Sequence, residues 1–530
     1  MAFDYVIVGG GSAGAALAAR LSDWAKVLLL EAGGRASHPW VNIPLGYGKV
    51  FYDKRFNWKY VTETDPVLGR AMYWPRGKGL GGSSAINAMV YVRGHKEDFD
   101  PWGAGWRWED VEPVFRRMED WRGPAHPARG TGGPLCVTDM TNAMHPLSRG
   151  YITAAEQAGI PYNPDYNAGN MTGAGFYQIT TCDGLRASTA RAYLRPFSGR
   201  DNLKIETGAL VTKVLFEDGR ALGVEYRQNR TLKTARAKAE VILCGGAINT
   251  PQLLQLSGIG PGALLRDMGI AAVHENAQVG RNLMDHLGYE LMYAAHQPSL
   301  NQVLRPWWGK LRAALTYALT RKGPLSMSLN QGGGFVRVSD HDGPPDLQLY
   351  FSPLTYSRAP VGVRPLMNPD PFPAFRLGYA PCKPTSMGHL QIRSPDPAVP
   401  PEMQPNYLAT NTDCDMMIEG FRLIRKIAQT PAFQAIAARE ITPGPDLQDD
   451  AGVLDEIKRD CWTVFHQCGT ARMGNDPVTS VVDHRLRVHG VRGLRVADAA
   501  IFPTIPSGNT NAAAIMVGEK ASDIIREDAR

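Results

Sequence analysis

The 530-residue sequence has little cysteine and no long apolar run. Its seven cysteines are an odd number, and no two of them stand as Cys-x-x-Cys. The sequence therefore predicts neither a disulfide framework nor a zinc site, and a reducing compartment fits this cysteine content. No stretch of about 20 apolar residues occurs, so we expect no transmembrane helix.

We expect no leader segment from the pattern at the start of this sequence, and one sign of charge is not in strong excess. An apolar run follows Met1 almost directly, without the basic segment and cleavage site of secreted chains. The 57 Lys and Arg residues are interspersed with 51 Asp and Glu residues, for a net charge of +6. No basic cluster points to nucleic acid. We expect a cytoplasmic protein, and the composition is also compatible with peripheral docking on a membrane.

The start of the chain has the pattern of a strand, a glycine-rich turn, a helix and a second strand. Residues 5–8 and 26–30 are short apolar runs, and residues 13–21 carry apolar side chains at helical spacing. Residues 240–244 and 494–498 are apolar runs of the same kind. The pattern predicts an α/β fold that begins with a Rossmann-type βαβ unit and gains further strands later in the chain.

The first turn carries the Gly-x-Gly-x-x-Gly pattern of dinucleotide-binding units. Gly9 permits a tight turn, Gly11 lets the backbone approach a pyrophosphate, and Gly14 allows close packing of helix on strand. The helix that starts at Ser12 and Ala13 presents its unpaired N–H groups to the phosphates. A dinucleotide is therefore the expected ligand.

The second predicted strand ends at Glu31, 17 residues after Gly14. A carboxylate there can accept hydrogen bonds from both ribose hydroxyls, which argues against the 2′-phosphate of NADP. A second glycine-rich run, residues 76–87, continues into apolar residues 88–92, so it is unlike an exposed linker. Two such loops favour FAD over NAD, which the first unit alone does not separate.

The composition changes across residues 297–400, where Pro, Gly and aromatic residues such as Trp307, Trp308 and Tyr317 are frequent. The alternating run at residues 346–351 is typical of antiparallel strands. We expect a second domain here, inserted into the first, with a partly apolar pocket.

Several motifs together resemble the glucose–methanol–choline family of flavoprotein oxidoreductases, and in particular its choline-dehydrogenase-like alcohol dehydrogenases. The motifs are the first turn with Glu31 and the segments at residues 77–94, 246–260, 466–474 and 508–511. The resemblance implies a Rossmann-type FAD domain with an inserted substrate domain built on a mostly antiparallel sheet. It spans nearly the whole chain and is weakest in the middle.

The resemblance also implies domain limits and cofactor contacts. Residues 1–296 would be mainly the FAD domain, with substrate-domain segments at about 150–196. Residues 297–454 would be mainly the substrate domain, and residues 455–530 would return to the FAD domain. Some members attach FAD through a histidine that Ile86 replaces here, so we expect non-covalent FAD. The cofactor contacts implied after the first unit are Gly82, Ser83, Asn87, Met89, Val90, Val211, Asp498 and Ala499.

Oxidation of an alcohol needs a base for the hydroxyl proton and a donor to the developing alkoxide. The resemblance assigns the base to His466, one of twelve histidines, and the second polar group to Asn509. His286 lies in a family-like segment and is interpreted as structural. No cluster of His, Asp or Glu has the spacing of a metal site.

We therefore expect FAD-dependent oxidation of a primary alcohol, polyol or sugar, with a dehydrogenase favoured over an oxidase. The electron acceptor, a quinone, an artificial acceptor or oxygen, is left open. A lyase or photodecarboxylase on the same scaffold is an alternative, because Cys382 lies near a cysteine that such members carry. The presence of His466 favours packing as the role of Cys382. A flavin-binding protein without turnover and a nicotinamide dehydrogenase are further alternatives.

Overall fold

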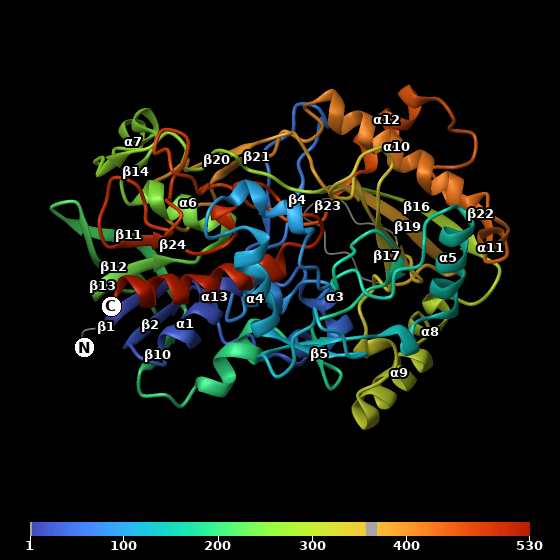
Figure 1. Cartoon of the computed structure of the whole chain (residues 1–530), viewed down its shortest axis with the longest axis horizontal. Coiled ribbons are helices and arrows are strands. Elements are labelled where there is room, and N and C mark those ends of the chain that lie inside the picture. The colour runs from blue at the N-terminus through green and yellow to red at the C-terminus, as the bar shows by residue number, and fades with distance from the viewer. Residues whose placement is uncertain (1–2, 357–367) are drawn as a thin grey trace.

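A computed structural model describes residues 3–356 and 368–530, and two seven-stranded sheets form its centre (Figure 1). In the first sheet the strands run in the order β10-β2-β1-β13-β12-β11, and β24 pairs with β13. These strands are β1 (Phe3–Val8), β2 (Val27–Glu31), β10 (Leu203–Thr207), β11 (Ala209–Glu217), β12 (Arg220–Gln228), β13 (Thr231–Leu243) and β24 (Leu494–Val496).

Strand β13 joins two kinds of pairing. Its first half pairs antiparallel with β12, and its last residues pair parallel with β1 and β24. β1 pairs parallel with β2 in turn, so the apolar runs predicted as one Rossmann-type sheet do share a sheet. Their side chains are buried because helices cover this sheet, which explains why the runs are continuous rather than alternating.

The second sheet is antiparallel throughout and has the order β22-β16-β19-β18-β17-β7, with β23 beside β16. Helices α5 (Pro146–Gln157) and α10 (Asn411–Ala428) pack against it. The fold class predicted from the sequence is confirmed, whereas the domain limits stay a prediction. The strands are β7 (Gly173–Phe176), β16 (Leu287–Ala295), β17 (Gly332–Val336), β18 (Leu347–Ser352), β19 (Ala374–Pro381), β22 (Ala437–Thr442) and β23 (Trp462–Thr463).

The first and last long helices of the chain lie against each other, α1 (Ser12–Leu21) and α13 (Asn511–Asp528). The Ser12 hydroxyl donates to Asn511 Oδ1 at 2.8 Å. A Cβ atom at Gly518 would lie 2.3 Å from the carbonyl oxygen of Ala13, so only glycine permits this approach. Residues nearly 500 positions apart therefore build one side of the first sheet.

Part of the aromatic-rich region is helical, beside the antiparallel strands β17, β18 and β19 that its alternating runs indicated. Helices α8 (Leu300–Leu304) and α9 (Trp307–Thr320) carry Trp307, Trp308 and Tyr317. The reason is local: Pro306 precedes a run free of further proline, in which Gly309, Ala313 and Tyr317 recur every four residues and are buried. Among the described residues, no helix is long and apolar enough to cross a membrane.

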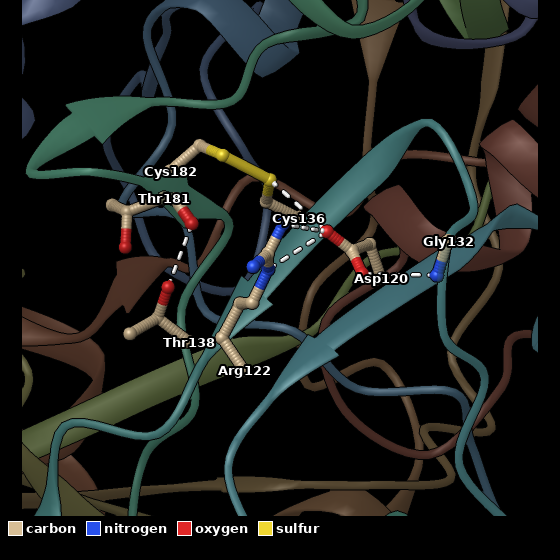
Figure 2. The surroundings of a disulfide bond; sticks show 7 residues. All are labelled: Asp120, Arg122, Gly132, Cys136, Thr138, Thr181 and Cys182. Atoms are coloured by element: carbon tan, nitrogen blue, oxygen red, sulfur yellow. Dashed lines mark hydrogen bonds and ion pairs between the residues drawn. A yellow bond between two sulfur atoms is a disulfide. The ribbon is translucent and has the colours of Figure 1, made fainter.

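Cys136 and Cys182 form a disulfide, which corrects the expectation that the cysteines stay unpaired (Figure 2). It joins β6 (Leu135–Thr138) to β8 (Thr181–Cys182), and the Thr138 hydroxyl beside it donates to the Thr181 carbonyl at 2.7 Å. The partners are 46 positions apart, and the spacing of the seven cysteines does not indicate that these two form a pair. The reducing compartment expected from the cysteine content stays a prediction.

Candidate active site and cofactor cavity

A cavity of about 630 Å³ runs from the end of β1 to the face of the second sheet. Of the sixteen residues that the sequence analysis singled out for catalysis or cofactor binding, only Gly14 does not line it. The others are Gly9, Gly11, Ser12, Ala13, Glu31, Gly82, Ser83, Asn87, Met89, Val90, Val211, His466, Asp498, Ala499 and Asn509.

The glycines of the first turn have different surroundings. A Cβ at Gly14 would lie 2.0 Å from the Gly9 carbonyl oxygen, and one at Gly9 would lie 2.4 Å from the Cys244 carbonyl oxygen. These two glycines are required by the packing of the chain itself. At Gly11 an added Cβ would meet only Gly82 Cα, at 3.9 Å, so its open side faces the cavity.

Glu31 ties three loops together at the end of β2. Its carboxylate accepts hydrogen bonds from the backbone N–H groups of Gly10 (2.9 Å), Gly33 (2.7 Å) and Gly79 (2.9 Å). Burial raises the pKa of this carboxyl, and the three N–H groups oppose that shift. The carboxylate thus fixes both glycine-rich loops at the cavity in addition to the ribose contact expected for it.

Asp498 has an equivalent role at the end of β24. Its carboxylate accepts hydrogen bonds from Gly246 N (2.8 Å), Ala500 N (2.7 Å) and the Thr250 hydroxyl (2.6 Å). Helix α6 (Gly246–Leu256) is thereby held with its N-terminus at the cavity. The residues of α6 were part of a sequence motif, but nothing in the motif pointed to this contact.

Asn87 is held by a buried guanidinium. Arg186 donates to Asn87 Oδ1 at 2.7 Å, and to the carbonyl oxygens of Val41, Pro44 and Ser84 at 3.1–3.3 Å. Burial lowers the pKa of Arg186 to about 9. Arg186 was not expected from the sequence, because it is far from Asn87 in the chain and belongs to none of the motifs.

His466 and Asn509 lie next to each other at the wall of the cavity. Asn509 Nδ2 is 3.1 Å from His466 Nε2, and Asn509 Oδ1 accepts a hydrogen bond from Gln348 Nε2 at 3.0 Å. Tyr350 in turn donates to Gln348 Oε1 at 2.6 Å. The second sheet therefore orients the Asn509 amide through Gln348 on β18.

The adjacent residues Asp285 and His286 hold His466 from behind. Asp285 Oδ1 accepts the backbone N–H of His466 at 2.7 Å, and His286 Nδ1 lies 2.9 Å from His466 Nδ1. His286 Nε2 lies 3.0 Å from the Cys382 carbonyl oxygen. His286, interpreted from the sequence as structural only, is thus in direct contact with the histidine that the resemblance singles out.

Both histidines are buried, and burial is the main influence on their pKa values. It lowers the pKa of His286 to about 4. The pKa of His466 lies well below its usual range because of burial first, and also because of the positive charge of Arg76. Both rings are accordingly neutral at neutral pH.

The cavity beyond the His466 side chain has an aromatic wall. Trp462 and Phe465 flank the His466 turn with their ring centroids 6.4 Å apart, and Tyr350 lies 6.3 Å from Trp462. Phe51 packs edge-on against Phe465 at 5.3 Å. Phe465 has a left-handed φ of 65°, and the Thr463 hydroxyl accepts its N–H at 2.9 Å. Ring surface dominates this end of the cavity.

Three guanidinium groups line the cavity, those of Arg70, Arg76 and Arg376. Arg76 is buried and donates to the Phe465 carbonyl at 2.6 Å. Arg376 pairs with Glu290 at 2.5 Å. Within the described residues, no group of three or more His, Cys, Asp or Glu residues has the arrangement of a metal site.

These features fit FAD. The open glycine Gly11 lies at the N-terminus of α1, where a pyrophosphate is stabilised, and the buried Glu31 marks the end of β2. Ile86, not histidine, precedes Asn87 on the second loop. A mostly parallel sheet with this cavity, joined to an antiparallel sheet that carries the aromatic wall, defines a two-domain flavoprotein oxidoreductase.

The chain belongs to the GMC oxidoreductase family: the models of that family match residues 3–288 and 384–518. It is 42% identical to an alcohol dehydrogenase (acceptor) of Pseudomonas putida, over 99% of this chain and 95% of that protein. It is 40% identical to the mitochondrial choline dehydrogenase of Homo sapiens, over 99% and 90% of the two chains.

A solved structure, the pyridoxine 4-oxidase from Mesorbium loti, is similar throughout. Its TM-score is 0.88 at 30% identity, and the match covers 99% of each chain. The family resemblance inferred from the motifs is confirmed. The protein is an FAD-dependent oxidoreductase that acts on the CH–OH group of alcohols and binds its FAD without a covalent link.

Proposed function

We propose that the protein is a dehydrogenase of uncharged alcohols with an apolar substituent, in which His466 is the base and Asn509 the hydrogen-bond donor to the substrate oxygen. Bound FAD supplies the acceptor for the hydride that leaves the alcohol carbon. The observation that carries the proposal is the direction of the hydrogen bonds that lead from the Cys382 carbonyl through His286 to His466 Nδ1 and leave Nε2 without a proton.

That direction is set by a backbone carbonyl. The Cys382 oxygen can only accept, so the neutral His286 ring carries its proton on Nε2 and leaves Nδ1 as an acceptor. His466 must then donate from Nδ1 to His286, and the lone pair of His466 is on Nε2, the atom beside Asn509. Because the carbonyl can only accept, each ring nitrogen in this series of hydrogen bonds is fixed as either a donor or an acceptor.

A lone pair on Nε2 suits proton removal from an alcohol. The lowered pKa of His466 keeps the ring neutral, and hence able to take a proton, at neutral pH. The Asn509 amide has two N–H bonds. Gln348 donates to the amide oxygen and so fixes the plane in which both N–H bonds lie. Asn509 can therefore donate to an alcohol oxygen that approaches Nε2, and this contact strengthens as negative charge develops on that oxygen.

The charges of the cavity favour a neutral substrate over choline, which the human relative is named for. The aromatic wall alone would accommodate either an apolar group or a quaternary ammonium. The positive charge of Arg76 is opposed by the buried carboxylate of Asp285, and the carboxylate of Glu290 is ion-paired with Arg376. A cationic alcohol would have to compete with these guanidinium groups for the carboxylates, whereas a neutral alcohol would not.

Steady-state kinetics with an artificial electron acceptor test the substrate class. We expect primary alcohols with an aliphatic or aromatic group, such as octanol and benzyl alcohol, to have kcat/KM values at least about 100-fold above that of choline. Sugars and polyols should also be poor, because the ring surface offers few hydrogen-bond partners. A preference for choline would overturn the proposal.

The preference for a non-oxygen acceptor rests on the similarity to the P. putida alcohol dehydrogenase (acceptor). It is tested by comparing turnover with oxygen alone and with a quinone or dye acceptor at the same alcohol concentration. Turnover should be much faster with the added acceptor. Equal rates, with hydrogen peroxide formed in proportion to the alcohol consumed, would identify an oxidase instead.

A further inference from the structure

Helix α9 turns its apolar side chains toward solvent. Trp307 is 76% exposed, Trp308 57%, Leu311 50%, Leu315 54% and Leu319 84%. Residues 308, 311, 315 and 319 follow helical spacing and so share one face of the helix. The opposite face packs inward through the glycine, alanine and tyrosine described above.

This arrangement is the reverse of an ordinary surface helix, which buries its large apolar side chains. Together with Val303 on α8, six of the fifteen large apolar side chains exposed in the described chain lie within residues 303–319. An apolar patch of this size on a folded protein marks a binding surface. α9 lies at the rim of the molecule, at the lower right of Figure 1, where its outer face is open.

The charged residues on α9 and directly after it are all positive. Lys310, Arg312, Arg321 and Lys322 are exposed on or directly after α9. The sequence has no Asp or Glu from residue 291 through residue 339. None of these four side chains is ion-paired within the described residues. The surface therefore combines tryptophan and leucine side chains with a cationic border.

We propose that α9 docks the protein on the surface of a bilayer of anionic phospholipids, with Trp308, Leu311, Leu315 and Leu319 inserted among the acyl chains and the cations at the headgroups. A helix of this composition that is too short to span a membrane lies in the plane of the interface. Tryptophan is enriched at that depth, and lysine and arginine reach anionic headgroups while their stems stay apolar.

The same charges disfavour a second copy of this chain as the occupant of the patch. A two-fold interface would bring the α9 helices of two protomers together and set cation against cation. Anionic lipid satisfies both the apolar face and its border. The surface thus points to lipid as the partner.

The docking surface also backs the substrate end of the cavity. Ala313, on the inner face of α9, belongs to the same buried cluster as Leu354, and Leu329 and Tyr356 pack against that cluster. Leu354, Leu329 and Tyr356 line the cavity. In a docked protein, a single layer of side chains would therefore separate the inserted helix from the apolar end of the cavity.

Vesicle flotation with the FAD-loaded full chain tests the proposal. We expect binding to vesicles of phosphatidylglycerol and phosphatidylcholine, weaker binding to phosphatidylcholine alone, and weakening by salt. The combined variant Trp308→Ser, Leu315→Ser and Leu319→Ser should bind at least about 100-fold more weakly, since each lost side chain removes a large apolar area from the membrane. The charge variant Lys310→Glu with Arg312→Glu should lose the preference for anionic vesicles.

The matched control is Leu232→Ser with Val478→Ser, which removes two exposed apolar side chains far from α9 in the sequence. The control should bind vesicles like the unmodified protein, and all variants should keep the flavin spectrum and the activity on a water-soluble alcohol. Absence of binding to anionic vesicles would overturn the proposal, as would equal loss in the control. A dimer in light scattering that the α9 variant dissociates would assign the face to a second copy instead.

Discussion

His286 and His466 face each other through their Nδ1 atoms, 2.9 Å apart, although 180 positions separate them in the chain. One of the two atoms must carry the proton, and the carbonyl of Cys382 decides which one, because it requires a proton on the far nitrogen of His286. The basic nitrogen of His466 is thus selected by a backbone group that lies two hydrogen bonds away from it.

Replacing His466 by Ala should leave FAD bound and slow flavin reduction by about 10²–10⁴-fold, the usual contribution of a positioned base. Anaerobic stopped-flow measurement of flavin reduction against pH is the suitable experiment. The base works when neutral, so the rate should rise with pH through its pKa. Because the pKa of His466 lies well below 6.5, the rise should fall on the acid side and the rate should be level above pH 7. A variant that reduces its flavin at the normal rate would remove His466 from the mechanism.

Replacing His286 by Leu should slow flavin reduction by roughly 10–100-fold, the scale on which supporting hydrogen-bond partners of active groups act. His286→Gln retains an acceptor oxygen for the Nδ1 proton of His466 and should recover part of the rate. The acid limb should move to lower pH in His286→Leu, because the neutral His286 ring accepts the Nδ1–H of His466 and so favours its protonated form. A lower rate with the limb unmoved in both variants would indicate a packing role only.

Asn509→Ala should slow flavin reduction by about 10²–10³-fold, the value of one donor to a developing oxyanion. Asn509→Asp is the sharper test, since a carboxylate has a similar shape but cannot donate when ionised. Both variants should retain the acid limb of the pH profile because His466 is unchanged. Full activity in Asn509→Asp would show that no donor is needed at this position.

Gly11→Val should give a folded protein without flavin. An added Cβ meets only Gly82 Cα, at 3.9 Å, and lies on the side that faces the cavity, so we expect the side chain to occupy cofactor space without breaking the packing of the turn. The ratio of flavin to protein absorbance and the circular dichroism spectrum measure the two effects separately. Gly199→Val is the control, because its surroundings are open. A normal flavin content in folded Gly11→Val would place the nucleotide elsewhere.

Thiol titration in denaturant without reductant should find five of the seven cysteines reactive, and all seven after reduction. Replacing Cys136 and Cys182 together by Ser should lower the free energy of unfolding by about 2–4 kcal/mol, the expected contribution of a crosslink that closes a loop of this length. Seven reactive thiols before reduction would exclude the disulfide.

The sequence predicts best what depends on neighbouring residues. The turn from Gly9 to Gly14, the buried runs on either side of it and the alternating residues of β18 are local patterns, and each forms the expected element. Gly14 was expected to allow helix–strand packing, and its contact with the Gly9 carbonyl has that character.

The contacts that orient the site are not local, and no spacing of residues in the sequence indicates them. Asp285, His286 and Gln348 reach His466 and Asn509 from separate strands and loops, and only the sheet topology brings them together. The outward face of α9 was missed for another reason. Tryptophans and leucines in a chain are read as core or pocket, and the sequence does not state which face of a helix the rest of the protein covers.

The contact between α1 and α13 has a consequence for how the protein is made. The Gly11 turn leaves the ribosome early, whereas Asn511, which accepts a hydrogen bond from Ser12, is translated 499 residues later. At 5–20 residues per second this interval is roughly 25–100 s. The flavin site therefore stays open on its helical side during almost all of synthesis, and a chain that stops before Asn509 lacks both this residue and the helix that closes the site. Cofactor capture is accordingly a late event in biogenesis, so added flavin should not rescue such interrupted chains.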